Sequence, residues 1–429
     1  MDIVIETTDV AIIGAGPSGA IAAALLRKYG HRVVVLEQTH FPRFSIGESL
    51  LPQCMEFIAE AGMLDAVNSA GFQYKNGAAF ARNGEKAAFD FRDKFSPGMG
   101  TTFQVQRARF DQVLAEEAAK AGADIRFGHR IDAFGYGEDE RPLLTYFDNE
   151  GQRQQLSAGF VLDASGFGRV LPRLLDLELP SDFPLRMSLF THIEDNISDP
   201  LHDRDKILIV VHPRFEEVWY WLIPFSNGRC SLGVVAPKGF FDTATSTPEQ
   251  LLREAVNTSP DLSQLLANAR FDTPVNQIGG YACNVKSLWG KGYALLGNAG
   301  EFLDPVFSSG VTIAMKSASL AAPLVNRALS GGEVDWETEY AQPLRLGVDT
   351  FRTYVTAWYE GSFQKVIFSQ GQQPEVRAMI ASILAGYAWD TNNPFVRESR
   401  RRLNTLVALC TEPAFSPTAG PSCEVLPCS

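Results

Sequence analysis

The chain has 429 residues, of which 45% are hydrophobic, so it is long enough for two or three lobes that each bury a core. Its 38 Lys and Arg residues against 50 Asp and Glu residues give a net charge of -12, which argues against nucleic acid as a partner. The six cysteines show no C-x-x-C pair and no metal-ligand spacing, so we expect reduced thiols, no metal site and a cytoplasmic location.

The first long apolar run covers residues 10–26. It contains Gly14, Gly16, Pro17 and Gly19, and no basic residue precedes it. A strand, a tight turn and a helix therefore explain it better than a membrane span or a signal segment. No other run is long enough to cross a bilayer, and we expect no membrane partner.

The opening segment predicts the first half of a doubly wound parallel sheet. We expect a strand at residues 9–13, a helix at 18–29 and a strand at 32–37. The turn at residues 14–19 reads G-A-G-P-S-G and fits the G-x-G-x-x-G fingerprint. Such glycines let the backbone approach a pyrophosphate at a helix N-terminus, and Glu37 would accept hydrogen bonds from ribose hydroxyls.

The later elements alternate between two lobes. Helices are expected at 52–62 and 110–121, with weakly alternating strands at 71–95 and a buried strand at 160–163. The strand-rich runs at 207–211, 218–224 and 230–235 predict an antiparallel sheet, with one inserted helix at 248–267. A strand at 293–297 and a long apolar helix at 311–329 follow, and the rest is helical.

These elements predict a discontinuous dinucleotide-binding domain, a sheet domain on the substrate side and a helical C-terminal region. The first domain is assigned to residues 1–70, 101–168 and 287–335, and the sheet domain to 71–100 and 169–286. The helical region covers 336–411. The tail, residues 412–429 with Cys423 and Cys428, is expected to be poorly ordered.

The hexapeptide Trp219-Tyr220-Trp221-Leu222-Ile223-Pro224 is the least probable motif, because the whole chain has only six tryptophans. On a strand, Trp219 and Trp221 share one face. They would form a bulky apolar wall that keeps organic substrate and water from a neighbouring reactive group. The alternative interpretation is that they are ordinary core aromatics of a strand.

Three motifs together resemble the flavin-dependent halogenases, within the FAD fold of the aromatic hydroxylases. They are the W-x-W-x-I-P run, the segment F-L-D-P-V-F-S-S-G at residues 302–310, and the segment around Lys75 at residues 71–80. The resemblance runs from Asp9 to about Leu329. It implies an α/β fold with a Rossmann-like FAD-binding domain, an interleaved antiparallel β-sheet substrate domain and a helical C-terminal region.

The resemblance also implies which residues contact FAD. They are Gly14, Gly16, Pro17, Ser18, Gly19, Glu37, Arg43, Ser49, Arg107, Asp163, Gly297 and Asn298. The family usually has an acid where Asn298 stands, and an amide can still donate and accept a hydrogen bond but lacks the charge. The alternative for the two arginines is an ordinary surface position. Because the chain has no second glycine fingerprint, we expect a separate flavin reductase to supply FADH2.

The chemistry implied is the formation of hypohalous acid from FADH2, O2 and chloride or bromide. Ser308, Ser309 and Gly310 form a turn at a helix start that would offer backbone N–H groups to the halide. Lys75, Trp219 and Trp221 are the implied catalytic residues. Lys75 would relay the halogen, either as an ammonium that hydrogen-bonds hypohalous acid or as an amine that forms a haloamine. A lysine is otherwise most often a solvated surface residue.

The substrate branch is indicated by Phe307, which stands where the tryptophan-specific members have an acid. The resemblance then points to an electron-rich phenol, a pyrrole or an aryl group tethered to an acyl carrier protein. A basic cluster could dock such an acidic carrier protein, although such a cluster is more often a solvated helix face. The cluster comprises Arg397, Arg400, Arg401 and Arg402.

Two other functions stay open on the sequence alone. One is an FAD-dependent aromatic hydroxylase, monooxygenase or other oxidoreductase of the same fold, which Asn298 favours. The other is a flavin-binding scaffold subunit without catalysis. Loss of Lys75 or of the Ser308–Gly310 turn would have favoured the scaffold, and both are present.

Overall fold

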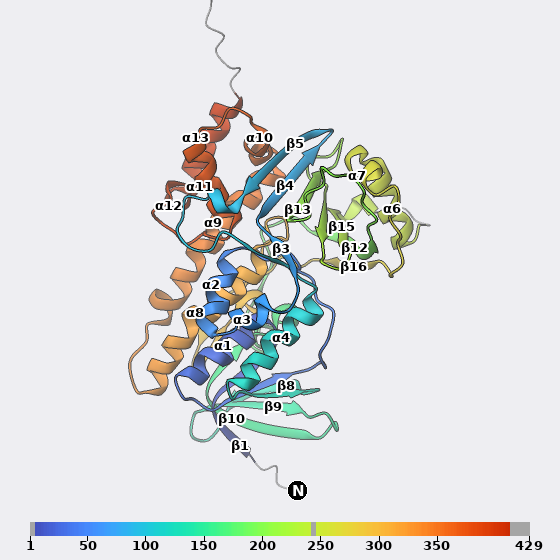
Figure 1. The fold of residues 1–429 in the computed structure, drawn as a ribbon. Coiled ribbons are helices and arrows are strands. Elements are labelled where there is room, and N and C mark those ends of the chain that lie inside the picture. Colours follow the sequence, from blue (N-terminus) through green and yellow to red (C-terminus); the bar gives the residue numbers. More distant parts are fainter. Residues whose placement is uncertain (1–4, 242–245, 412–429) are drawn as a thin grey trace, which may run out of the picture.

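Two large β-sheets and a C-terminal group of helices make up the computed structural model, which describes residues 5–241 and 246–411 (Figure 1). The predicted α/β fold class is confirmed. The predicted tail at 412–429, with Cys423 and Cys428, lies outside the described residues. Within the described residues, no helix is long and apolar enough to cross a membrane.

The first sheet is built around a parallel core and lies in the lower half of Figure 1. Its main path runs β18-β19-β10-β1-β2-β7, and β9 and β8 are added beside β10. The strands are β1 (Ile5–Ile13), β2 (Val33–Glu37), β7 (Asp124–Phe127), β8 (Arg130–Tyr136), β9 (Pro142–Phe147), β10 (Arg153–Asp163), β18 (Trp289–Gly290) and β19 (Tyr293–Leu295). Because β1 is parallel to both β2 and β10, Glu37 and Asp163 end their strands at the same edge as Ile13.

Helices cover one face of this sheet. They are α1 (Pro17–Lys28), α2 (Gln53–Ala61), α3 (Leu64–Asn68), α4 (Arg107–Lys120) and α8 (Ser309–Leu329). Helix α1 is rich in alanine and fully buried from Pro17 to Leu26, which allows it to pack closely against α4 and α8. The opposite face packs against side chains of β8, β9 and α5 (Val170–Leu174).

The second sheet is mostly antiparallel, in the order β16-β12-β15-β14-β13-β4-β5. Its strands are β4 (Gly77–Arg82), β5 (Glu85–Asp90), β12 (Arg186–Glu194), β13 (Lys206–Val211), β14 (Trp219–Pro224), β15 (Arg229–Pro237) and β16 (Asn276–Gly279). Alternation along β14 separates two cores. Trp219, Trp221 and Ile223 face the main core, whereas Tyr220 and Leu222 face a smaller core under α6 and α7.

The single inserted helix predicted at 248–267 is wrong, because the structure has two helices there, α6 (Pro248–Thr258) and α7 (Pro260–Leu265). Pro260 has no N–H to donate and disfavours helical geometry at the preceding residue. Ser259 accordingly has extended dihedral angles, φ -91° and ψ 112°. Thr247 caps α6 through its hydroxyl, which accepts a hydrogen bond from the Gln250 N–H.

The C-terminal region is helical, as predicted, and lies in the upper left of Figure 1 beside β4 and β5. A π-helical turn, η5 (Glu337–Ala341), leads into α9 (Gln342–Tyr359), α10 (Ser362–Phe368), α11 (Pro374–Leu384), α12 (Pro394–Arg397) and α13 (Ser399–Thr411). Two small sheets join the parts, one of β3 (Gln73–Lys75) with β6 (Thr102–Gln104) and one of β11 (Glu178–Leu179) with β17 (Asn284–Val285). Short 3-10 turns are η1 (Phe91–Asp93), η2 (Gly166–Gly168), η3 (Lys238–Phe241) and η4 (Gly297–Ala299).

Candidate functional site

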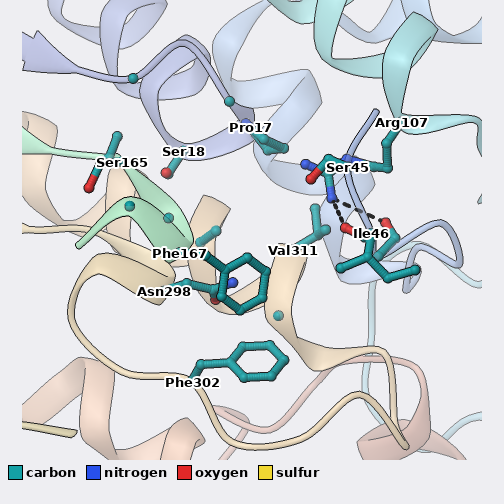
Figure 2. Close-up of a pocket in the computed structure, with 18 of the residues that line it drawn as sticks. Pro17, Ser18, Ser45, Ile46, Arg107, Ser165, Phe167, Asn298, Phe302 and Val311 are labelled. Carbon is teal, nitrogen blue, oxygen red and sulfur yellow. Dashed lines mark hydrogen bonds between the residues drawn. The ribbon is translucent and has the colours of Figure 1, made fainter. Parts of the chain in front are cut away.

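A cleft lies between the two large sheets and is shown in Figure 2. Most of the residues singled out in the sequence line it. They are Gly14, Gly16, Pro17, Ser18, Glu37, Arg43, Ser49, Arg107, Trp219, Trp221, Asn298, Ser308 and Gly310. Five others, Gly19, Lys75, Asp163, Gly297 and Ser309, are not among the described residues that line it.

The three glycines of the turn have different structural roles. Gly14 has φ +94°, and a Cβ there would lie 2.7 Å from the Ala164 carbonyl oxygen. A Cβ on Gly19 would lie 2.0 Å from the Gly14 oxygen, so Gly19 permits the close helix–strand contact. Gly16 faces the cleft, where a Cβ would meet only the Arg43 guanidinium at 3.6 Å. The N-terminus of α1 therefore presents open backbone to the cleft.

Glu37 holds the glycine turn as well as lining the cleft. The Ala15 N–H donates to its Oε2 at 3.0 Å, and the Thr39 N–H and hydroxyl donate to its Oε1 at 2.9 and 2.6 Å. A carboxylate oxygen accepts more than one hydrogen bond, so Oε2 keeps capacity for a ribose hydroxyl.

The two predicted arginines share one buried carboxylate. Arg107 donates to both oxygens of Asp111 at 2.7 and 3.0 Å, and Arg43 lies 3.2 Å from the same carboxylate. Arg107 also donates to the Ile46 and Gly47 carbonyls (Figure 2). Arg107 thus fixes the loop at residues 43–49, while Arg43 stays 24% exposed at the cleft.

Asp163 and Gly297 support the cleft wall from behind. Asp163 is fully buried, and it accepts hydrogen bonds from the N–H groups of Ser165 at 2.9 Å and Leu171 at 2.6 Å. Burial raises the pKa of this carboxyl. Gly297 has φ +51°, and a Cβ there would lie 2.7 Å from the Ala314 side chain of α8. Both residues therefore shape the turns from which cleft residues project.

Asn298 projects into the cleft near Phe167 (Figure 2). Its side-chain oxygen Oδ1 is buried and has no hydrogen-bond partner among the described residues. A buried acceptor without a partner is costly, so this atom is suited to a hydroxyl donor from a bound molecule.

The start of α8 forms the turn predicted to bind halide. Ser308 has φ +56°, and no side chain of the described chain caps the helix there. Ser308 and Gly310 line the cleft, whereas Ser309 is 1% exposed and faces the core. The helix has 21 residues, so its uncapped N-terminus carries a full dipole and free N–H donors.

Trp219 and Trp221 share the cleft face of β14, with ring centroids 6.0 Å apart. Their polar atoms are already bonded within the protein. The Trp219 Nε1–H donates to the Tyr359 hydroxyl at 2.9 Å, and the Trp221 Nε1–H donates to the Ser231 hydroxyl at 3.0 Å. The two indoles therefore offer the cleft mainly apolar surface.

Lys75 lies directly behind the cleft wall and is 1% exposed. Its Nζ donates to the Ser49 hydroxyl at 2.8 Å and to the Leu50 carbonyl at 2.7 Å, and lies 5.4 Å from the centroid of the Phe91 ring. Burial lowers the pKa of Lys75 to about 7. Ser49 lines the cleft, so Lys75 is bonded to a residue of the cleft wall.

Two polar contacts near the cleft were missed by sequence reasoning. Glu48 is 1% exposed, its Oε1 lies 2.7 Å from His192 Nε2, and its Oε2 has no partner among the described residues. The Tyr359 hydroxyl, bonded to Trp219, donates in turn to Asp304 at 2.9 Å. The sequence analysis singled out none of Glu48, His192 and Tyr359, because no local signal marks them. Across residues 5–241 and 246–411, no group of three His, Cys, Asp or Glu side chains is arranged to hold a metal ion.

Comparison with known proteins gives consistent matches over nearly the whole chain. A family described as an FAD binding domain matches residues 7–320. A 1H-pyrrole-2-carbonyl-(peptidyl-carrier protein) chlorinase from Pseudomonas fluorescens is 28% identical over 420 residues, covering 92% of each chain. A solved flavoprotein/dehydrogenase from Cytophaga hutchinsonii is 44% identical with a TM-score of 0.91, covering 94% of this chain and 99% of that one. A solved flavin-dependent brominase is 25% identical with a TM-score of 0.81, covering 93% and 99%.

Proposed function

We propose a function from one premise: the chain belongs to the FAD-binding-domain family and, within it, to the flavin-dependent halogenases. Its cofactor is FAD, and a halide is its co-substrate. The proposed reaction makes hypohalous acid from FADH2, O2 and chloride or bromide, and transfers the halogen through Lys75 to an electron-rich aromatic ring. The observation that carries the proposal is the buried Lys75 amine, which donates a hydrogen bond to the cleft-lining residue Ser49.

The residues of the cleft fit FAD. The open N-terminus of α1 at Gly16 suits the pyrophosphate, and Glu37 and Arg43 lie beside it. The unpartnered Oδ1 of Asn298 suits a ribityl hydroxyl. Bound and reduced, FAD would supply the two electrons that reduce O2 to the peroxide level, and that oxidant would convert the halide to hypohalous acid. Ser308 and Gly310, at the uncapped start of α8, would bind that halide through backbone N–H groups.

The tryptophan wall would separate this oxidation from the organic substrate. Trp219 and Trp221 fill the cleft face of β14 and expose no unbonded polar hydrogen. Hypohalous acid formed in the cleft would meet an apolar wall on that side, and polar groups at Ser49 and Glu48 on another. The Ser49 hydroxyl is therefore the proposed point of contact between the cleft and Lys75.

Two roles of Lys75 give the same overall reaction, in which hypohalous acid and an aromatic C–H yield an aromatic C–halogen bond and water. As an ammonium, Lys75 donates a hydrogen bond to the oxygen of hypohalous acid, which then leaves as water. As an amine, it first forms an N–halogen bond and releases water. The ring then takes the halogen from nitrogen and returns a proton, restoring the amine.

The proposed partners follow the same reasoning. The first is a separate flavin reductase, supported by the single glycine fingerprint of the chain. The second is an acyl carrier protein that bears the phenol, pyrrole or aryl substrate, supported by the carrier-bound substrate of the Pseudomonas relative. Arg397, Arg400, Arg401 and Arg402 are exposed, although Arg401 and Arg402 each lie 3.4 Å from Glu398. A cytoplasmic location stays a prediction.

A flavin hydroxylase or dehydrogenase is the second candidate. The tight enclosure of Lys75 favours it, because at 1% exposure the amine has no open contact with a substrate. The similar Cytophaga protein is named a flavoprotein/dehydrogenase, which also supports this candidate. Under this alternative the buried lysine only supports the cleft wall.

The test supplies the purified protein with a flavin reductase, NADH, bromide or chloride, and electron-rich aromatics both free and carrier-bound. Mass spectra are searched for halogen isotope patterns. Lys75→Met should lower halogenation at least about a hundredfold. Lys86→Met, which changes an exposed lysine on β5, serves as the matched control and should retain it. A hydroxylated product would support the second candidate, and halogenation undiminished in Lys75→Met would overturn the proposed relay.

A further inference from the structure

A second cavity lies beside the cleft and encloses about 590 Å³. It is bounded by the start of β12, the β11–β17 pair and the loop at residues 302–305. Much of its lining is apolar, with Leu179, Pro180, Phe183, Pro184, Leu185 and Leu303. Nothing in the proposed function uses this space.

The loop at residues 302–305 is the partition between the cleft and the second cavity. Phe302 and Pro305 line the cleft, while Leu303 and Asp304 line the second cavity. The Phe302 ring packs edge-on against Phe167 of the cleft, with centroids 5.3 Å apart (Figure 2). Only the loop at residues 302–305 would therefore separate a molecule in the second cavity from the proposed FAD site.

Arg186 is the charged residue of the second cavity that has side-chain hydrogens left unbonded among the described residues. It is 6% exposed, and its Nε and Nη1 hydrogens have no acceptor among the described residues. The guanidinium carbon lies 3.3 Å from the centroid of the Tyr359 ring. Within residues 5–241 and 246–411, Arg186 forms no ion pair of 4.0 Å or less, although it interacts electrostatically with the buried Asp304. An enclosed cation with unbonded donors is strongly unfavourable, so a bound acceptor would stabilise it.

The other charged groups of the cavity are already bonded. Arg169 pairs with Glu178 at 2.8 Å. The Asp304 carboxylate accepts from the Val306 N–H and from the Tyr359 hydroxyl, each at 2.9 Å. Burial raises the pKa of Asp304 to about 6, which weakens its compensation of the Arg186 charge in mildly acidic solution.

We propose that the second cavity binds a small organic monoanion, an apolar molecule that carries one carboxylate. The carboxylate would accept hydrogen bonds from Arg186, and the apolar part would pack against Leu185, Phe183 and Leu303. One free guanidinium suits a single negative charge. A phosphate dianion would face Asp304 without a second free cation among the described residues that line the cavity.

The test measures benzoate binding to the FAD-loaded protein by isothermal titration calorimetry, with benzamide as the uncharged probe. One site should bind benzoate, and benzamide should bind at least tenfold more weakly. Arg186→Met should weaken benzoate binding at least tenfold. Ala282→Phe, which fills the cavity and keeps the charge, should weaken it comparably. Arg214→Gln changes an exposed arginine outside the cavity lining and should leave binding unchanged.

Thermal melting and bound-FAD absorbance show whether each variant is folded, and Ala282→Phe tests the proposal even if Arg186→Met fails to fold. Absence of benzoate binding, or equal binding by the wild type and Ala282→Phe, would overturn the proposal. Displacement of benzoate by equimolar chloride would identify an inorganic anion site and overturn the organic class. The measurement involves no turnover, so its outcome is independent of whether the chain halogenates.

Discussion

The ionisation of Lys75 gives the sharpest prediction, because it separates the two roles proposed for this side chain. Burial lowers the pKa of Lys75 to about 7, so the group is mainly an ammonium below that pH and mainly an amine above it. The ammonium fraction falls from about nine-tenths at pH 6 to about one-tenth at pH 8. A hydrogen-bond donor role therefore predicts a transfer rate that falls about tenfold over this range. A haloamine role predicts a rise of similar size.

The assay is single-turnover halogenation with pre-reduced FAD and bromide, quenched at intervals and followed by mass spectrometry. An added scavenger of hypohalous acid, used in parallel, measures the preceding oxidation step. Lys75→Arg keeps a positive charge at every pH tested, because the guanidinium does not lose its proton. It should be active with a flat profile if the ammonium donates, and inactive if the haloamine forms. If the transfer rate of Lys75→Arg still changes near pH 7, the ionisation belongs to another group, and the assignment to Lys75 is refuted.

The same burial predicts how Lys75→Met affects stability. A pKa displaced from 10.5 to about 7 corresponds to about 5 kcal/mol of preference for the neutral form. The hydrogen bonds to Ser49 and Leu50 oppose this by about 1 to 3 kcal/mol each. Because Lys75→Met removes both effects, its melting temperature at pH 6 should stay near or above that of the wild type. A large fall in melting temperature would show that the hydrogen bonds of Lys75 stabilise the protein by more than its desolvation costs.

The remaining predictions concern the cleft. Asn298→Ala removes the unpartnered acceptor and should raise the Kd for FAD about tenfold in a fluorescence titration, whereas no change would exclude the ribityl contact. Arg107→Met leaves the buried Asp111 carboxylate with only Arg43 and should lower the unfolding free energy by about 3 kcal/mol in urea titration; a neutral result would contradict the bracing role of Arg107. Trp219→Phe should leave FAD binding intact but release more hydrogen peroxide per NADH, and loss of FAD would make this ring part of the core.

Local periodicity was enough to predict several parts of the site. A strand turns alternate side chains to opposite faces, so Trp219 and Trp221 had to share one face, and β14 places both in the cleft. The glycine turn was equally predictable, because Gly14 needs its φ of +94° and Gly19 contacts Gly14 within the same strand–turn–helix unit, whereas the contact of Gly14 with Ala164 is long-range. The break between α6 and α7 was also readable from Ser259-Pro260 and was missed.

The polar contacts could not be predicted, because they join residues far apart in the chain. Tyr359 follows Trp219 by 140 positions, and His192 follows Glu48 by 144. No pattern within either segment specifies the partner, since each contact depends on how the C-terminal helices and the second sheet dock on the first. The lowered pKa of Lys75 has the same origin, because it comes from burial rather than from a neighbouring charge in sequence.

The loop at residues 43–50 contains Arg43 and contacts the cleft, the buried Lys75 and Arg107. Along residues 43–50, Arg43 lies at the cleft, Glu48 bonds His192, and Ser49 bonds Lys75. Arg107 holds the same loop through the Ile46 and Gly47 carbonyls. The proposed contact between hypohalous acid and Lys75 would therefore run through Ser49, whose hydroxyl accepts a hydrogen bond from the Lys75 Nζ while Arg107 holds the loop main chain. Ser49 is then the residue that links the enclosed Lys75 to the cleft.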